Sequence, residues 1–354
     1  MLQIIKRKLA PYSEKMFSFW PGGWSPFPTN VVFEILYGCN LKCSFCYLRK
    51  EEVVKKIKRR RQLFTDEILK IIDQISRSTS IAFTGGEVTV HKDIIKILAY
   101  AKKNHRVGII SNLTAITKEQ IKKIVDIGLD TLMFSLDGPT AEIHDLGRGQ
   151  GSFNKTVANL KLIQQVKKQR RKINPTITMN SLILPQNYQL LTKTVQLAHQ
   201  LKVTWLNFQL LDPSLDRSGY DLHENLYHLK DNRKTLIKLP AKKFKISLNS
   251  ALTEAEKLKV RISFSPSLTP AQIVDYYQGK VDLKKIFCNK IFHLTRISPF
   301  GDVYPCFNLK IGSVLEKPLM FWWNSAVYRK FRQQIKRGAY RHACVGCCHL
   351  RLKP

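Results

Sequence analysis

The stretch VVFEILYGCNLKCSFCYL, residues 31–48, joins an apolar, β-branched run to a loop with three cysteines. Val31–Tyr37 has the composition of a buried strand, and Gly38 ends it. Cys39, Cys43 and Cys46 follow with the spacing CxxxCxxC. Three thiolates on one short loop can bind three irons of a cubane cluster and leave the fourth iron without a protein ligand. An external chelate can bind that open iron and receive an electron.

Two other interpretations of this loop stay open. The cysteines can form a zinc site or remain unpaired thiols in the core. Structural zinc sites prefer four ligands in paired CxxC spacing, which this loop lacks. A ferredoxin that only transfers electrons would supply a fourth cysteine nearby, and the next one along the chain is Cys288. We therefore favour a cluster with an open iron.

Outward from this loop, short β-branched runs alternate with stretches of helical period. We expect strands at Val31–Tyr37, Ser80–Thr84, Arg106–Ser111, Thr131–Leu136, Thr176–Ile183 and Val203–Leu210, and helices at Phe64–Ser76, Lys92–Asn104, Lys118–Ile127, Ser152–Lys168 and Gln189–Leu201. This alternation predicts an α/β fold with a parallel sheet, curled into a barrel or part of one. Functional groups in such folds collect in the loops after the carboxyl ends of the strands.

The rhythm breaks after Leu211, and the last five cysteines all lie beyond Ile286. We divide the chain into an irregular N-terminal extension at 1–30, a core barrel at 31–215, a polar and helical connector at 216–285, and a small cysteine-bearing domain at 286–354. Lys245–Val260 within the connector resembles a further helix.

The chain is strongly basic, with 59 Lys and Arg against 26 Asp and Glu and a formal net charge of +33. This charge can attract an anionic partner, but we favour the simpler interpretation that it is solvated charge scattered over the surface. No secretory signal and no apolar stretch long enough to span a bilayer is visible, so we expect a cytoplasmic protein. In a reducing compartment, clustered cysteines are typical metal ligands.

Further motifs follow the next strands in order. They are Thr84-Gly85-Gly86-Glu87, Ser111-Asn112, Ser135-Leu136-Asp137-Gly138-Pro139, and then Arg148. Together with the cysteine loop, they resemble the radical S-adenosylmethionine (SAM) superfamily, whose signature is CxxxCxxC with an aromatic residue before the last cysteine. Phe45 occupies that aromatic position. The match after the third strand is partial, because Leu113 stands where the family often has glycine.

The resemblance implies a partial (β/α)6 radical SAM barrel. Cys39, Cys43 and Cys46 would hold a [4Fe–4S] cluster. SAM would bind among Phe45, Gly85, Gly86, Glu87, Ser111, Asn112, Ser135 and Arg148, with the Glu87 carboxylate receiving the methionyl ammonium. A surface arginine in a glycine-rich loop is the alternative for Arg148, and a polar core residue is the alternative for Asn180. In such enzymes the reduced cluster cleaves SAM into methionine and a 5′-deoxyadenosyl radical, which abstracts hydrogen from an unactivated C–H bond.

The C-terminal cysteines resemble the shortened, twitch-like form of the SPASM auxiliary-cluster domain. Cys288, Gly301, Cys306 and the run Cys344-Val345-Gly346-Cys347-Cys348 carry this resemblance. It implies a second, auxiliary [4Fe–4S] cluster on Cys288, Cys306, Cys344 and Cys347, with Cys348 left over and the choice between Cys347 and Cys348 open. A four-cysteine zinc site is the alternative.

These resemblances favour an enzyme, of oxidoreductase or maturase type, that oxidises, cross-links or dehydrogenates a peptide or a small polar or anionic substrate. A flavodoxin- or ferredoxin-type donor would supply electrons, and a peptide substrate would need a separate recognition protein or direct docking. RNA modification and a non-catalytic iron–sulfur or zinc scaffold are alternatives. We expect no nucleic-acid partner, because no RNA-binding module or basic–aromatic stripe is evident. Asp137, Glu142 and Asp145 are equal candidates for a general base.

Overall fold

The computed structural model describes residues 20–49, 51–211, 236–306, 309–339 and 344–353. Residues 1–19 of the expected N-terminal extension and 216–235 of the expected connector lie outside this part of the chain. All the motifs identified above lie within it.

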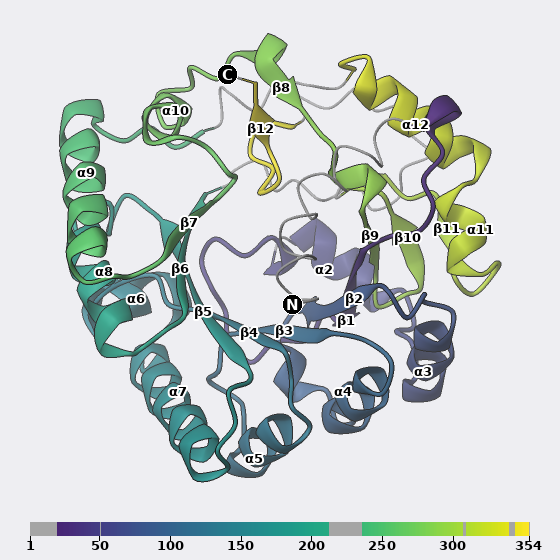
Figure 1. Ribbon diagram of the computed structural model, residues 1–354, viewed down its shortest axis with the longest axis horizontal. Helices are drawn as coiled ribbons and strands as arrows, with labels where there is room; N and C mark the ends of the chain where they lie inside the picture. The colour runs from purple at the N-terminus through teal and green to yellow at the C-terminus, as the bar shows by residue number, and fades with distance from the viewer. Residues whose placement is uncertain (1–19, 50, 212–235, 307–308, 340–343, 354) are drawn as a thin grey trace, which may run out of the picture.

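A curved parallel sheet forms the centre of the molecule (Figure 1). Its first seven strands pair in chain order, each parallel to the next. They are β1 (Asn30–Leu36), β2 (Ser80–Gly85), β3 (Val107–Ser111), β4 (Thr131–Ser135), β5 (Thr176–Ile183), β6 (Trp205–Leu210) and β7 (Ile262–Ser265). The six expected strands and the partial barrel are thus confirmed. β7 is an additional parallel strand within the segment expected to be the connector.

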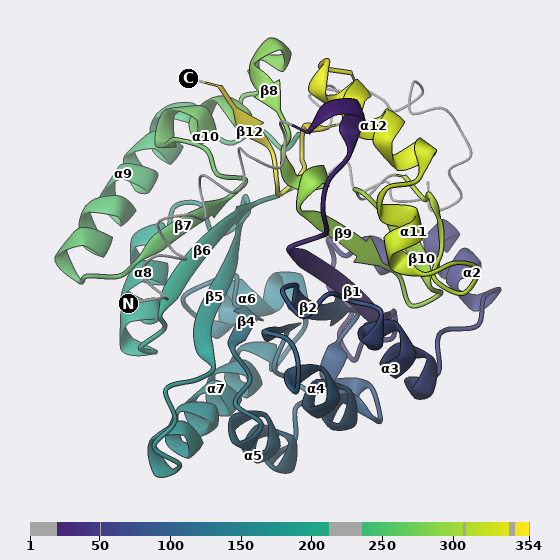
Figure 2. The ribbon, with the colours of Figure 1, turned by 45° about the vertical axis from the view of Figure 1, so that its right-hand side comes forward.

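Helices line the outer, convex side of this sheet (Figures 1 and 2). They include α3 (Thr65–Asp73), α4 (Ile94–Lys102), α5 (Lys118–Asp126), α7 (Ser152–Gln169), α8 (Leu191–Gln200) and α9 (Ala241–Lys257). Three shorter helices, α2 (Glu51–Lys58), α6 (Ala141–Arg148) and α10 (Pro270–Tyr276), lie in the connections. The helices expected from the sequence are confirmed, and α2, α6 and α10 were not predicted.

The two faces of the sheet differ in polarity because side chains alternate along each strand. In β1, Phe33 and Ile35 are buried in the same core cluster as the apolar residues of α3 and α4. Glu34, between them, points to the concave face. The concave face carries polar and partly exposed side chains, so the sequence builds a helix-covered wall around an inner surface suited to binding.

Three C-terminal strands extend the same sheet past β1: β9 (Leu294–Ile297), β10 (Asp302–Tyr304) and β11 (Gly312–Ser313). Two further strands, β8 (Ile286–Phe287) and β12 (Arg351–Leu352), form a separate two-stranded sheet, and the helices α11 (Leu319–Trp323) and α12 (Ala326–Lys336) lie between β11 and β12 in the chain. β9 pairs in parallel with β1, and β10 and β11 continue antiparallel beyond it. The ten-stranded order β11-β10-β9-β1-β2-β3-β4-β5-β6-β7 thus joins strands from three of the expected segments. The division at residues 215 and 286 stays a prediction.

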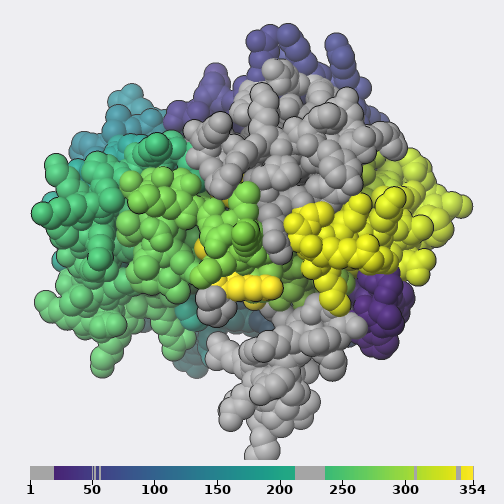
Figure 3. Space-filling view, turned by 90° about the horizontal axis from the view of Figure 1, so that it is seen from above, coloured from purple at the N-terminus to yellow at the C-terminus, as the bar shows by residue number. Residues whose placement is uncertain are grey.

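The first described residues of the chain lie against its C-terminal helices. In the space-filling view, the dark purple start of the chain touches the yellow C-terminal segment (Figure 3). The Arg332 guanidinium on α12 donates to the carbonyl oxygen of Gly23 at 3.0 Å, and the Gln333 amide donates to that of Gly22 at 2.8 Å. Across the described ranges, none of the helices combines the length and the apolar character that a membrane crossing would need.

Candidate metal centre and active site

The three-cysteine loop begins two residues after β1 and is held against the end of α6. The backbone N–H of Ser44 donates to the carbonyl oxygen of Gly147 at 2.9 Å. A Cβ atom added to Gly147 would lie 2.8 Å from the Phe45 ring, so only glycine lets the ring pack this closely. Phe45 therefore serves first to pack the loop against the barrel.

The three thiols lie close enough to influence one another. Burial raises the pKa of Cys39, with further contributions from Glu87, Cys43 and Cys46. Burial also raises the pKa of Cys43, whereas the positive charge of Arg148 opposes this shift. The Cys39 sulfur accepts the backbone N–H of Leu41 at 3.4 Å and faces the Asn112 amide at 3.8 Å.

This donor set fits three corners of an iron–sulfur cluster. Thiolates ligate such clusters, and N–H donors and a buried cation reduce the cost of gathering their negative charge. Among the described residues, no three His, Cys, Asp or Glu side chains converge tightly enough to enclose a single metal ion. Thiolates bound to separate irons need no such convergence. The assignment of Cys39, Cys43 and Cys46 as cluster ligands stays a prediction that this geometry supports.

Gly85 and Gly86 bring β2 against the start of the cysteine loop. The N–H of Gly86 donates to Leu36 O at 2.8 Å, and the N–H of Glu87 donates to Gly38 O at 2.9 Å. A Cβ atom at Gly86 would lie 2.1 Å from Gly38 O, and one at Gly85 the same distance from Leu36 O. Gly85 and Gly86 thus allow the backbone after β2 to approach the backbone that leads into the cysteine loop.

We expect Gly86→Ala to displace this loop. The added methyl group would overlap backbone that cannot rotate away, so the variant should lose about 2–3 kcal/mol of stability and part of its iron. Gly38→Ala is the matched control, because its Cβ would meet only the Leu36 Cδ1 atom at 3.6 Å. Urea unfolding and iron analysis measure both effects, and equal behaviour of the two variants would contradict the steric argument.

Glu87 is the centre of a buried hydrogen-bond network, with 1% of its surface exposed. Its Oε1 accepts the Thr89 backbone N–H, the Thr89 hydroxyl and the Ser111 hydroxyl at 2.7–3.0 Å. Its Oε2 accepts the backbone N–H of Asn112 at 2.6 Å. The structure thus brings Glu87, Ser111 and Asn112 together beside Cys39. Their contact with SAM stays a prediction.

Arg148 is buried at the end of α6, so the alternative of a surface arginine is wrong. Its Nε atom donates to the Asp137 carboxylate, and its guanidinium carbon lies 5.3 Å from the centre of the Phe45 ring. The other Asp137 oxygen accepts the Leu182 N–H at 2.9 Å. Arg148 thus connects the β4–α6 region to the cysteine loop. The Ser135 hydroxyl, at the end of β4, makes no hydrogen bond within the described residues.

His144 is held neutral inside this network. Its Nδ1 accepts the Asp137 backbone N–H at 2.9 Å, and burial lowers its pKa from 6.5 to about 4. Between pH 6.5 and pH 4, His144 is protonated in the unfolded chain and stays neutral in the folded chain. The contribution of His144 to stability is therefore complete above pH 6.5 and is lost as the pH falls toward 4.

From this shift we expect the wild-type protein to lose about 3 kcal/mol more stability than His144→Gln between pH 7 and pH 4. The difference between the two proteins removes the contribution of other titrating groups. Urea unfolding at several pH values measures it. Parallel pH profiles would show that His144 does not resist protonation.

A row of polar side chains crosses the concave face from β5 to β7. The Asn207 amide donates to the Asn180 carbonyl, and the Asn180 amide donates to Gln209 Oε1 at 3.0 Å. The hydroxyls of Ser263 and Ser265 donate to Asn207 Oδ1 at 3.0 and 3.1 Å. Asn180 is 7% exposed, which agrees with the alternative that it is a polar core residue. Its hydrogen-bond partners nevertheless belong to the row of uncharged polar side chains inside the barrel.

The pairing of β8 with β12 sets Arg351 opposite Phe287. The chain that follows the Cys344–Cys348 turn therefore lies next to the residue that precedes Cys288. Burial raises the pKa of Cys288, and the backbone N–H groups of Lys290 and Ile291 oppose this shift. Thiolates with backbone N–H donors, such as Cys288, are suitable ligands of an auxiliary cluster. The identity of the C-terminal cysteines as ligands, and the choice between Cys347 and Cys348, remain predictions.

The carboxylates considered as general bases have different surroundings. Asp137 is held by Arg148, and Asp145 accepts the N–H groups of Gly151 and Phe153 at the start of α7. Glu142 is exposed on α6. The sequence analysis missed Glu34, a buried carboxylate on the concave face. An acid within the apolar run VVFEIL was a signal that could have identified it.

Fold and site together define a parallel α/β barrel with a three-thiol loop at its carboxyl edge and further cysteines in the C-terminal elements. Family comparisons agree with both features. Residues 33–198 match the model of the radical SAM superfamily, and residues 288–348 match that of the iron–sulfur cluster-binding SPASM domain. The chain belongs to the radical SAM superfamily and carries a C-terminal SPASM domain. These domains imply a SAM-binding [4Fe–4S] cluster, SAM and an auxiliary iron–sulfur cluster as cofactors.

Similar proteins span most of this chain. It is 27% identical to the AdoMet-dependent heme synthase of Methanosarcina barkeri, with 90% of this chain and 91% of the relative covered. It is 26% identical to the mycofactocin maturase MftC of Mycolicibacterium smegmatis, with 91% and 76% covered. Streptococcus suis SuiB, solved with the precursor peptide SuiA, shares the fold with a TM-score of 0.64, 16% identity and coverage of 86% and 67%.

Proposed function

We propose that this protein reductively cleaves SAM and uses the resulting 5′-deoxyadenosyl radical to abstract hydrogen from a peptide or a small polar substrate. The [4Fe–4S] cluster supplies the electron that breaks the sulfur–carbon bond of SAM. The observation that carries this proposal is the loop of Cys39, Cys43 and Cys46 at the end of β1. Its surroundings of glycine backbone, amide and guanidinium groups support the same reaction.

The protein's own residues position the reactants and keep water away. Gly85 and Gly86 fix the loop against β2, and the Arg148 guanidinium offsets negative charge beside Cys43. The polar row from Asn180 to Ser265 offers hydrogen-bonding groups without net charge on the concave face. Such a surface suits amide or hydroxyl groups of a substrate, whose buried polar atoms need partners.

Relatives that act on peptides favour a peptide substrate. Besides MftC, they include the PqqA peptide cyclase of Rhodopseudomonas palustris and the subtilosin biosynthesis protein AlbA of Bacillus subtilis. An electron donor of flavodoxin or ferredoxin type and a separate peptide-recognition protein are part of this proposal. The oxidation or cross-link would require loss of a hydrogen atom to the 5′-deoxyadenosyl radical and then of one electron and one proton, and an auxiliary cluster held by the C-terminal cysteines would supply an electron acceptor.

A second candidate is oxidation of an anionic tetrapyrrole. The similarity to a heme synthase covers about nine tenths of both chains, and the net charge of +33 favours a substrate with carboxylates. This candidate keeps the same cysteine loop and the same cleavage of SAM, and differs only in what loses hydrogen.

The test uses the full chain with clusters reconstituted without oxygen. With dithionite and SAM it should form 5′-deoxyadenosine, detected by chromatography and mass spectrometry. Deuterated peptides and deuterated iron-coproporphyrin then report which substrate transfers deuterium into 5′-deoxyadenosine. No 5′-deoxyadenosine from protein that contains iron would refute the proposed function. Deuterium transfer from the porphyrin alone would select the second candidate.

A further inference from the structure

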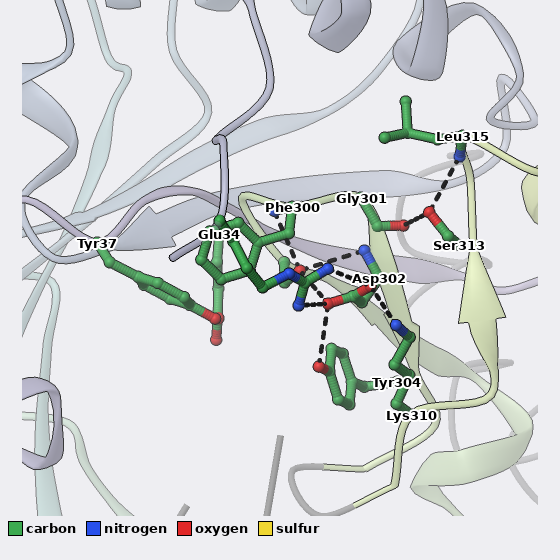
Figure 4. Close-up of polar contacts among 11 residues, drawn as sticks. Glu34, Tyr37, Phe300, Gly301, Asp302, Tyr304, Lys310, Ser313 and Leu315 are labelled. Carbon is green, nitrogen blue, oxygen red and sulfur yellow. Dashed lines mark hydrogen bonds and ion pairs between the residues drawn. The ribbon is translucent and has the colours of Figure 1, made fainter. Parts of the chain in front are cut away.

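The barrel and the C-terminal cysteine domain meet along a seam between β1 and the β9–β10 hairpin. We define the seam by two carboxylates with their cations and two aromatic rings: Glu34, Tyr37, Arg60, Arg296, Phe300, Asp302 and Lys310. Strand pairing sets Val32 of β1 opposite Arg296 of β9. Figure 4 shows Glu34 and Tyr37 on one side of Phe300, and Asp302 with Tyr304 and Lys310 on the other.

One half of the seam is built around Glu34, which is 5% exposed. Its Oε1 accepts from the Arg296 guanidinium at 3.2 Å, and its Oε2 accepts the Tyr37 hydroxyl at 2.9 Å. Tyr37 lies two residues before Cys39. Arg296 on β9 therefore joins the C-terminal hairpin to the strand that leads into the Cys39 loop.

The other half is built around Asp302, which is fully buried. Both Asp302 oxygens accept from the Arg60 guanidinium, with one N–O distance of 2.9 Å, and Oδ1 also pairs with Lys310 Nζ at 2.9 Å. The Arg60 guanidinium carbon lies 4.2 Å from the centre of the Phe300 ring. Phe300 meets the Tyr37 ring edge-on with centres 5.5 Å apart. Arg60 follows α2 in the barrel half, so Asp302 reaches across the seam.

These contacts specify one docking position. Apolar strands alone can pair in more than one register, whereas a buried charge left without its partner is strongly unfavourable. Glu34 meets Arg296, and Asp302 meets Arg60, only when β9 and β10 lie against the barrel as observed. The Glu34–Arg296 and Arg60–Asp302 pairs lie on either side of the Tyr37–Phe300 ring contact. Tyr37 is followed two residues later by Cys39, the first cysteine of the loop.

We propose that Glu34, Arg60, Arg296 and Asp302 are positioning residues that hold the C-terminal cysteine group at one fixed separation from the Cys39–Cys46 loop. The inference rests on the proposed function, because it assigns a role to the distance between two clusters. The seam would then transmit a disturbance of either half of the molecule to the other cysteine group.

The test compares Arg60→Gln and Asp302→Asn with the control Arg61→Gln. Arg61 is adjacent in the chain and forms a two-bond pair with Glu67 at 2.7 and 2.8 Å, but it is half exposed and lies outside the seam. We expect amides of residues 294–304 to exchange hydrogen at least about tenfold faster in the two seam variants than in the control. In reduced, reconstituted protein, the EPR signature of magnetic interaction between the clusters should weaken or broaden.

Equal exchange and equal EPR interaction in Arg60→Gln and Arg61→Gln would overturn the proposal. If Asp302→Asn fails to fold, Arg60→Lys tests the same contact, because it keeps the charge and loses the two-bond geometry; it should fall between wild type and Arg60→Gln. The seam inference fails alone when wild type forms 5′-deoxyadenosine and the variants match the control. Wild type with iron but without 5′-deoxyadenosine refutes the proposed function instead.

Discussion

Cys43→Ala protein should form no 5′-deoxyadenosine above background, whatever the substrate proves to be. Cys43 is the most buried thiol of its loop, and the guanidinium of Arg148 offsets its negative charge. Removing a residue that only hydrogen-bonds a metal ligand typically lowers activity about 10–100-fold. Removing the ligand itself should lower the rate of SAM cleavage more, by at least about a hundredfold. Reconstituted protein with SAM and dithionite gives the measurement.

Ser44→Ala is the matched control for this experiment. Ser44 is the next residue along the loop, and its main link to the barrel is a backbone hydrogen bond that alanine keeps. This variant should cleave SAM at nearly the wild-type rate. SAM cleavage by Cys43→Ala at the rate of Ser44→Ala would exclude Cys43 from the metal centre and remove the basis of the proposed function.

The second large effect is expected for Cys306→Ala, which should separate the two metal sites. Its iron content should fall from about eight to about four atoms per chain, because one of two cubane clusters is lost. Cleavage of SAM should continue, because Cys306 lies after β10 and is not part of the cysteine loop that follows β1. Iron and labile-sulfide analysis, together with the 5′-deoxyadenosine assay, measures both properties.

Cys348→Ala is the control within the same domain, and it should retain both clusters. Loss of the auxiliary iron in Cys348→Ala but not in Cys347→Ala would show that Cys348, and not Cys347, is the ligand. One zinc and no second cluster in the wild-type domain would replace the auxiliary cluster with a structural zinc site. Loss of SAM cleavage in Cys306→Ala protein that is folded would contradict the separation of the two sites.

Local patterns predicted the barrel well, because each parallel strand is a short β-branched run bounded by turn residues. The expected strand at residues 176–183 matches β5 at both ends. β7 escaped prediction, because its four residues, Ile262–Ser265, include two serines and offer too short an apolar run. Asn207 is a polar residue among the apolar residues of β6. Its role is explained only by β7, whose Ser263 and Ser265 hydroxyls donate to its Oδ1 atom.

A candidate site could be proposed from the sequence where its chemistry lies within one loop. The spacing of Cys39, Cys43 and Cys46 indicates a cluster without any knowledge of the fold. The links between distant segments were not predictable, because nothing local to Glu34 indicates that Arg296 will face it. Asp302 likewise gave no local signal, because its ion pair with Arg60 joins residues 242 positions apart in the chain.

The pairing of β1 with β9 also has a consequence for how the molecule is made. A ribosome completes β1 some 260 residues before Leu294–Ile297 emerges, which at typical speeds is a delay of about 10–50 s. Until then, the edge of β1 that later pairs with β9 has unsatisfied backbone hydrogen-bonding groups. The three reactive thiols of Cys39, Cys43 and Cys46 follow this edge directly. We expect nascent chains truncated before residue 294 to aggregate through this unpaired edge, and holdase chaperones to be needed most during that interval.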